Sequence, residues 1–140
     1  MTNPNHIAAH ERTAHEAQPL AEVTEVLQQY LDALYYSDAD RMSQVFHNSG
    51  VYATADAEPV LIRDKPTYLA VLAQRESPAT RGEPRRDHID RVDFAGANTA
   101  RAQVRCAISG TNFMDYLTLI RDAGRWQIIA KVFQMGAKGD

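Results

Sequence analysis

Apolar and polar residues alternate along the second half of the chain, and this pattern limits the possible folds more than any other feature. In the clearest run, the apolar members are Ala102, Val104, Cys106 and Ile108. Such alternation is typical of a strand that buries one face. The segments that read as strands are 89–94, 99–109, 112–121 and 125–134. Glycine-containing turns at 95–98 and 122–124 predict that they form an antiparallel meander.

The first half of the chain carries helical periodicity instead. An apolar stripe with steps of three and four residues predicts a long first helix. Its members are Leu20, Val23, Leu27, Tyr30, Leu31 and Leu34. Two shorter helices are expected after the capping residues Ser37 or Asp38 and Asp64, with short strands at 51–55 and 59–63. Helices followed by a meander indicate an α+β domain whose helices cover one face of the sheet.

The composition agrees with one globular domain. The chain has 140 residues and a mass of 15.6 kDa, the size of a single domain. Its net charge of −3 lacks the basic excess of nucleic-acid-binding proteins. No segment approaches the roughly 18 apolar residues of a membrane helix, and the N-terminus lacks the pattern of a signal peptide. We therefore expect a cytoplasmic protein with a flexible arm at 1–19, a folded domain at 20–135 and a tail at 136–140.

The sequence predicts no metal site and no bound cofactor. His10 and His15 flank an acidic residue, but they are five positions apart. The zinc motif that they suggest needs histidines four positions apart, on one helix face. The single cysteine, Cys106, cannot form an internal disulfide and is expected to be a small buried residue. No glycine-rich phosphate loop is present.

Several short motifs, in their order and spacing, resemble the nuclear transport factor 2-like superfamily. They are Tyr30–Tyr35, Val45–His47, Ser77–Ala79, Asp115–Leu117 and Gly124–Phe133. The sequence is most similar to the SnoaL-like and "putative lumazine-binding" branch. This resemblance implies a cone-shaped fold, with N-terminal helices packed on the concave face of a curved, mainly antiparallel sheet. It also implies a cavity between helices and sheet, and a homodimer packed through the sheets.

The chain departs from the superfamily at one corner, because it has His47-Asn48-Ser49 where relatives often have His-Pro-Asp. The resemblance does not imply a reaction either. Members of the superfamily include isomerases, dehydratases, cyclases and binding proteins without catalytic activity, and a shared fold is a poor guide to chemistry.

Asp115 and Lys131 are the charged residues in the last two predicted strands that could share an apolar face. If residues 122–124 form a three-residue turn, Asp115 lies directly opposite Lys131, which is the register we favour because glycine suits its third position. If the turn has two residues, Asp115 faces Val132, and the two charges lie on opposite faces. In the favoured register the pair is a working acid and base in a pocket, a structural ion pair, or a partly solvated pair near the edge of the sheet.

Other candidate site residues follow from the expected cavity. His88 is a possible proton donor beside Asp115 and Lys131. The residues expected to contact a ligand are Tyr30, Tyr35, Phe113, Leu117 and Phe133.

Two functions remain open at this point. The first is binding of a small apolar or carbonyl-containing molecule, with acid–base chemistry of the isomerase, dehydratase or cyclase type that needs no cofactor. The second is a dimeric module without catalytic activity that serves interaction or binding.

Overall fold

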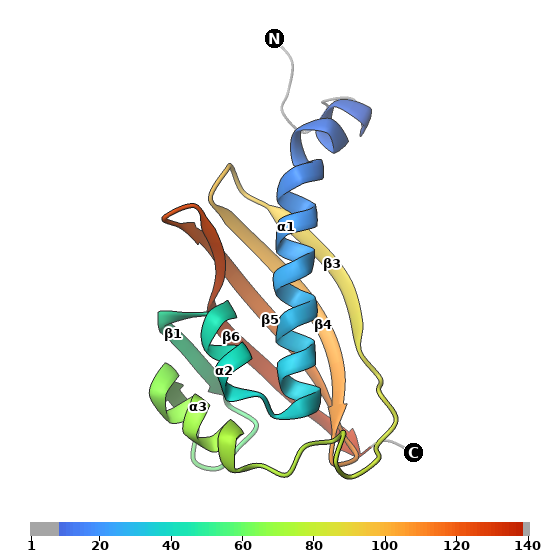
Figure 1. The fold of residues 1–140 in the computed structure, drawn as a ribbon, viewed down its shortest axis with the longest axis vertical. Coiled ribbons are helices and arrows are strands. Elements are labelled where there is room, and N and C mark those ends of the chain that lie inside the picture. Colours follow the sequence, from blue (N-terminus) through green and yellow to red (C-terminus); the bar gives the residue numbers. More distant parts are fainter. Residues whose placement is uncertain (1–8, 139–140) are drawn as a thin grey trace.

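The protein forms a curved sheet of six strands with three helices on its concave side (Figure 1). The computed structural model describes the backbone of residues 9–138 and the side chains of residues 16–136. The elements are α1 (Ala9–Tyr36), α2 (Ala39–Val45), β1 (Phe46–Thr54), β2 (Leu61–Asp64), α3 (Lys65–Gln74), β3 (His88–Phe94), β4 (Thr99–Ile108), β5 (Thr111–Asp122) and β6 (Arg125–Lys138). The strand order is β2-β1-β6-β5-β4-β3. Only β1 and β6 pair in parallel, so the expected α+β fold with a mainly antiparallel sheet is confirmed.

The helices begin where the sequence predicts, with one exception. Asp38 caps α2 by accepting a hydrogen bond from the backbone N–H of Arg41 at 3.0 Å, and Asp64 caps α3 in the same way through Thr67. However, α1 begins at Ala9, so the expectation of a helix from Leu20 placed its start too late. The first turns of α1 extend past the end of the sheet (Figure 1). A part of a helix beyond the end of the sheet does not have to cover the sheet, so the sequence gives no periodic signal there.

The core lies between the stripe of α1 and the concave face of the sheet. Its fully buried members include Val23, Leu27, Tyr30, Phe46, Leu72, Val104, Leu117, Leu119 and Ile128. Burying one large apolar side chain contributes about 1.5–3 kcal/mol. The alternation of β4 is observed directly, since Ala102, Val104 and Cys106 are buried while their neighbours are more exposed.

The last hairpin does not have the register that we favoured. Asp122 pairs with Arg125, so the turn consists of the two residues Ala123 and Gly124. Both have positive φ angles, 52° and 76°, as expected of the type I′ turn that suits two-residue hairpins. The prediction of a three-residue turn was wrong because it assumed that Gly124 alone, and not Ala123, would adopt the left-handed conformation.

A β-bulge then changes the consequence of that register. Leu119 pairs with Ile128, but Thr118 pairs with Ala130, so Ile129 is an extra residue in β6. After the bulge Asp115 pairs with Phe133, and Lys131 pairs with Leu117. Asp115 and Lys131 therefore share the concave face as diagonal neighbours, neither directly opposite each other nor on opposite faces.

Two substitutions in the turn distinguish the registers. We expect Gly124→Ala to cost about 1–2 kcal/mol of unfolding free energy, because alanine is strained in the left-handed region. Ala123→Gly should stabilise the protein by up to about 1 kcal/mol, since it relieves the same strain. Urea unfolding of the two variants measures both effects. A three-residue turn predicts the opposite sign for Ala123→Gly.

Candidate functional site

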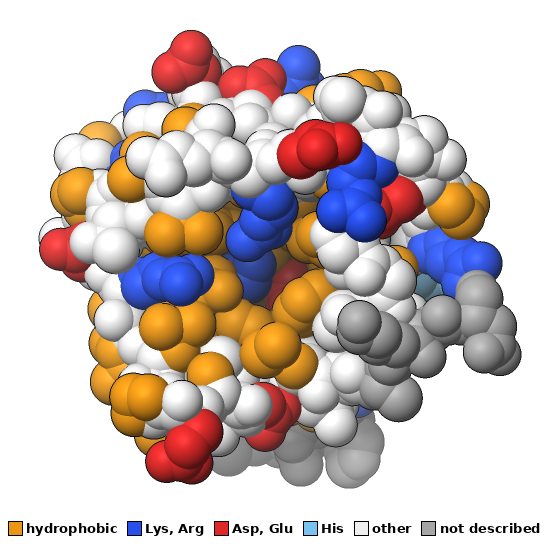
Figure 2. Space-filling view, turned by 90° about the horizontal axis from the view of Figure 1, so that it is seen from below, with side chains coloured by type: hydrophobic (Ala, Val, Ile, Leu, Met, Phe, Trp, Pro, Cys, Tyr) orange, Lys and Arg blue, Asp and Glu red, His pale blue; other side chains and the backbone are white. Residues whose placement is uncertain are grey.

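A cavity of about 260 Å³ lies at one end of the molecule, between the concave face of the sheet and α3. Its lining residues are Tyr52, Tyr68, Arg75, Cys106, Ile108, Ser109, Thr111, Phe113, Asp115, Lys131 and Phe133. Figure 2 views the molecule from the end where β4 turns into β5, and it shows a hollow among hydrophobic side chains with Lys and Arg side chains around it. The lining combines aromatic rings with a few charged groups, which is typical of small-molecule sites.

Asp115 is the buried acid of this cavity. Its side chain is 1% exposed, and its Oδ2 accepts a hydrogen bond from the Tyr30 hydroxyl at 2.5 Å. Burial, and then the charge of Asp115, raise the pKa of Tyr30 well above its usual value. The phenol is therefore protonated at neutral pH and donates to the carboxylate. The other carboxylate oxygen, Oδ1, is buried and has no partner among the described residues.

Lys131 is the buried cation of this cavity, and aromatic rings surround its ammonium group. Nζ lies 5.1–5.3 Å from the ring centroids of Tyr30, Tyr52, Tyr68 and Phe133. At this range a cation is attracted to the face of a ring. Nζ also donates a hydrogen bond to the Tyr68 hydroxyl at 3.1 Å.

The environment of Lys131 keeps it charged. Burial acts to lower the pKa of Lys131, but Tyr68 and Asp115 outweigh it, so the pKa is raised above its usual value. Within the described part of the chain, Lys131 and Asp115 form no direct ion pair. The cavity thus contains separated opposite charges.

Cys106 adds a thiol to the lining of the cavity, and Arg75 adds a second cationic side chain. Burial raises the pKa of the Cys106 thiol to about 12, so it is a neutral wall residue rather than a nucleophile. Arg75 follows α3 directly, and its backbone N–H bonds to the carbonyl of Leu72 at 3.2 Å. Arg75 is half-buried, and it lines the same cavity.

The structure brings together most of the residues predicted from the sequence. Phe113, Phe133 and Lys131 line the cavity together with Asp115, whereas Tyr30 bonds to Asp115 and is not a lining residue. Leu117 lies on the same face, but it is buried in the core and does not line the cavity.

Two predicted residues lie elsewhere. The Tyr35 hydroxyl donates to the carbonyl oxygen of Glu83 at 2.6 Å, so Tyr35 anchors a loop. The His88 side chain is 63% exposed and pairs with Asp90 through Nδ1 at 2.9 Å. His88 is the first residue of the edge strand β3, and β4 lies between β3 and β5. His88 therefore does not reach Asp115, and it does not line the cavity.

Sequence reasoning missed Tyr52 and Tyr68 as site residues. Tyr68 lies on the side of α3 that the apolar pattern marks as buried, but a buried tyrosine reads as a core residue unless its neighbours are known. Tyr52 reaches the cavity because β1 pairs in parallel with β6, which places it beside Lys131. A parallel crossover of this kind leaves no local signal in the sequence.

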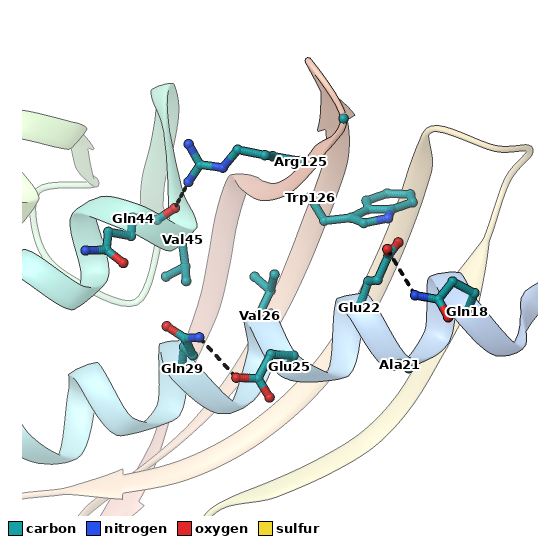
Figure 3. Close-up of a pocket in the computed structure, with 11 residues that line it drawn as sticks. Gln18, Ala21, Glu22, Glu25, Val26, Gln29, Gln44, Val45, Arg125 and Trp126 are labelled. Carbon is teal, nitrogen blue, oxygen red and sulfur yellow. Dashed lines mark hydrogen bonds between the residues drawn. The ribbon is translucent and has the colours of Figure 1, made fainter.

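A larger hollow of about 500 Å³ lies between α1, the end of α2 and the β5–β6 turn (Figure 3). The indole nitrogen of Trp126 is buried there without a partner among the described residues. Its acids, Glu22 and Glu25, are exposed and accept hydrogen bonds from Gln18 and Gln29 of the same helix. This hollow contains no buried charge, so its greater size does not make it the better candidate.

Within the described residues, no group of three or more His, Cys, Asp or Glu side chains is arranged to hold a metal ion. In the same part of the chain, no helix has the length and apolar character needed to cross a membrane.

Comparison with known families now places the fold and cavity in context. The family model described as "Putative lumazine-binding" matches residues 18–134, which is most of the chain. The chain belongs to this family. The resemblance to the "putative lumazine-binding" branch is thereby confirmed, and solved structures share the expected nuclear transport factor 2-like fold. No curated protein matches the chain.

Solved structures with the same fold come from several bacteria. An NTF2-like protein of unknown function from Shewanella baltica OS155 has a TM-score of 0.77 and 21% identity, over 86% of this chain and 96% of that one. One from Silicibacter pomeroyi DSS-3 has a TM-score of 0.73 and 20% identity, over 85% and 97%. A ketosteroid isomerase-like protein from Erwinia carotovora atroseptica SCRI1043 has a TM-score of 0.66 and 15% identity, over 84% and 96%. At these identities the comparisons establish the fold alone.

The buried charges of the cavity predict strong coupling in a double-mutant cycle. Lys131→Met should cost about 3–5 kcal/mol of unfolding free energy, because it leaves the Asp115 carboxylate buried without a compensating cation. Adding Asp115→Asn should recover much of that loss, since both charges are then gone. Denaturant unfolding at neutral pH measures the cycle. Arg101→Met, which removes a partner from an exposed ion pair with Asp93, is the control and should stay within about 0.5 kcal/mol. Additive losses would mean that the two charges do not interact.

Proposed function

We propose that the protein binds a small molecule in the cavity between sheet and α3, and that Asp115 is the group that recognises it. The observation that carries this proposal is the Oδ1 atom of Asp115, which is buried on the cavity wall without a partner among the described residues. Buried polar atoms in native proteins nearly always have a hydrogen-bond partner. A ligand that offers a hydrogen-bond donor or an acidic proton supplies the partner.

The size and lining of the cavity limit the ligand. A cavity of roughly 150 Å³ can hold benzene, and the volume of about 260 Å³ suits one ring with substituents. Phe113 and Phe133, whose ring centroids are 5.9 Å apart, offer apolar faces for such a ring. A flat single-ring heterocycle with an N–H donor meets these requirements. Lumazine, which the family description names, has two fused rings and the same kind of donor. A small carbonyl compound with an acidic C–H bond meets them as well.

Proton transfer is the chemistry that this arrangement supports. Asp115 Oδ1 would take a proton from a carbon beside a carbonyl group, and the electron pair of the broken C–H bond would pass to the carbonyl oxygen as an enolate. The charged Lys131 lies on the same face and favours that negative charge. Return of the proton to another carbon completes an isomerisation without a cofactor. Dehydration and cyclisation begin with the same step.

Binding of phenol, a small ring with one donor, tests the proposal. We expect phenol to shift amide NMR signals of residues around the cavity, and Asp115→Asn to weaken binding about tenfold or more, because hydrogen bonds to charged groups contribute about 1.5–3 kcal/mol. Thr111→Trp should also abolish binding, since it fills the cavity from its wall while leaving Asp115 intact.

The matched control is Thr118→Trp, which places the same side chain at an exposed position of the same strand. It should leave phenol binding unchanged. Equal binding to wild type, Asp115→Asn and Thr111→Trp would refute the proposal, because phenol would then bind outside the cavity.

A second function, dimerisation through the sheet, is favoured by the outer face. The strand registers align Ile62, Ala53, Val132 and Tyr116 in one row across β2, β1, β6 and β5. In this row Ile62 is 69% exposed, Tyr116 is 62% exposed and Val132 is 50% exposed. Apolar side chains that adjoin each other on an exposed sheet face are typical of protein–protein contacts. We propose that two copies of the chain pack through this row.

Light scattering at micromolar concentration checks the dimer. Wild type should have twice the mass of 15.6 kDa, and Tyr116→Lys should have the monomer mass, because a charge within the row opposes its burial. Tyr36→Lys changes a similarly exposed tyrosine at the end of α1 and should remain dimeric. A wild-type monomer would overturn this proposal without affecting the cavity.

The division of the chain at residues 19 and 135 stays a prediction, and so does the cytoplasmic location, which cell fractionation would test.

A further inference from the structure

We propose that the ligand of the cavity is an anion, carrying a carboxylate that Arg75 binds at the cavity mouth. This inference rests on the proposed function of the cavity and names the class of its ligand. The observations are the charges that line the cavity and the absence of an acidic partner for Arg75 among the described residues.

The lining of the cavity is cationic, although the whole chain carries a net charge of −3. Its charged members are Asp115, Lys131 and Arg75, and its remaining members are neutral. Cys106 is neutral because burial raises the pKa of its thiol to about 12, and Tyr68 is neutral because burial raises the pKa of its phenol. Lys131 balances Asp115, so the charge of Arg75 remains uncompensated inside the cavity.

The neighbouring arginines show what is different about Arg75. Arg81 pairs with Glu83 at 2.9 Å, and Arg85 pairs with both Asp32 and Asp87. Their charges are therefore neutralised within the protein. No described acidic residue pairs with Arg75, although it is half-buried and lines the cavity. A guanidinium fork suits a carboxylate, which it can hold through two parallel hydrogen bonds.

The surroundings hold Arg75 in place and add hydrogen-bond donors. The backbone N–H of Arg75 is bonded to Leu72 at the end of α3, so the residue is fixed to a helix rather than to a free loop. Ser109 and Thr111 contribute hydroxyl groups to the same lining. Glu83 is the nearby acid, but its carboxylate already accepts from the backbone N–H of Ser109 and pairs with Arg81. A carboxylate at the mouth therefore meets donors, and the ring that carries it extends toward Asp115.

Three probes separate this inference from the function on which it rests. Phenol offers only a donor for Asp115, whereas 3-hydroxybenzoate and 4-hydroxybenzoate add a carboxylate at two different distances from that donor. We expect at least one hydroxybenzoate to bind wild type about tenfold or more tightly than phenol, because of the charge-assisted hydrogen bonds to Arg75. This gain should shrink as salt is raised.

Two variants of Arg75 test whether this residue causes the tighter binding of the hydroxybenzoate. Arg75→Gln should remove the advantage of the hydroxybenzoate over phenol when both are measured on that variant, while Arg75→Lys should keep part of the advantage. The control is Arg86→Gln, which changes an exposed arginine in the loop between α3 and β3 that does not line the cavity. Thermal unfolding of each variant confirms that it is folded.

The outcomes distinguish the two proposals. If phenol binds through Asp115 but neither hydroxybenzoate binds more tightly, or Arg75→Gln does not reduce the gain, the anionic ligand is overturned and the small-molecule site stands. If a hydroxybenzoate binds through Arg75 and is insensitive to Asp115→Asn, the anion site stands and the role of Asp115 fails. If no probe depends on either residue, both proposals fail.

Discussion

Placing a carboxylate and an ammonium group in an apolar interior costs free energy that other contacts must offset, and the cavity of this protein is arranged around that requirement. Asp115 receives a hydrogen bond from Tyr30, which joins β5 to the stripe of α1. Lys131 donates a hydrogen bond to the hydroxyl of Tyr68 and lies close to four aromatic rings. Each charge is thus stabilised by elements other than its own strand, so the site exists only when helices and sheet are assembled.

The two charges are separated by the geometry of the sheet. The bulge at Ile129 makes Asp115 and Lys131 diagonal neighbours on one face, and among the described residues they form no direct ion pair. A closed ion pair would satisfy both carboxylate oxygens and leave little for a ligand. The observed arrangement leaves Oδ1 of Asp115 unpartnered among the described residues, and for this reason we regard the pair as a binding arrangement rather than a structural strut.

The same arrangement explains why the larger hollow near Trp126 is the weaker candidate. Its carboxylates are exposed and bonded within α1, so water can solvate them and no ligand is required. In the cavity near Asp115, the charged groups are withdrawn from water and interact more strongly with whatever enters. Burial of charge, and not volume, separates the two sites.

The sequence by itself determined the elements and the faces that they bury. The alternation in β4, the stripe of α1 and the caps Asp38 and Asp64 depend on residues close together in the chain. Each was observed where the sequence predicts it, except that Leu20, the first expected member of the stripe, is 43% exposed. The cone fold and family were also recognisable. Only the tertiary structure decided the position of the bulge, the parallel pairing of β1 with β6 that brings Tyr52 to Lys131, and the approach of Arg75. These features depend on how a curved sheet closes over α1 and α3, and contacts between distant segments leave no periodic signal in the sequence.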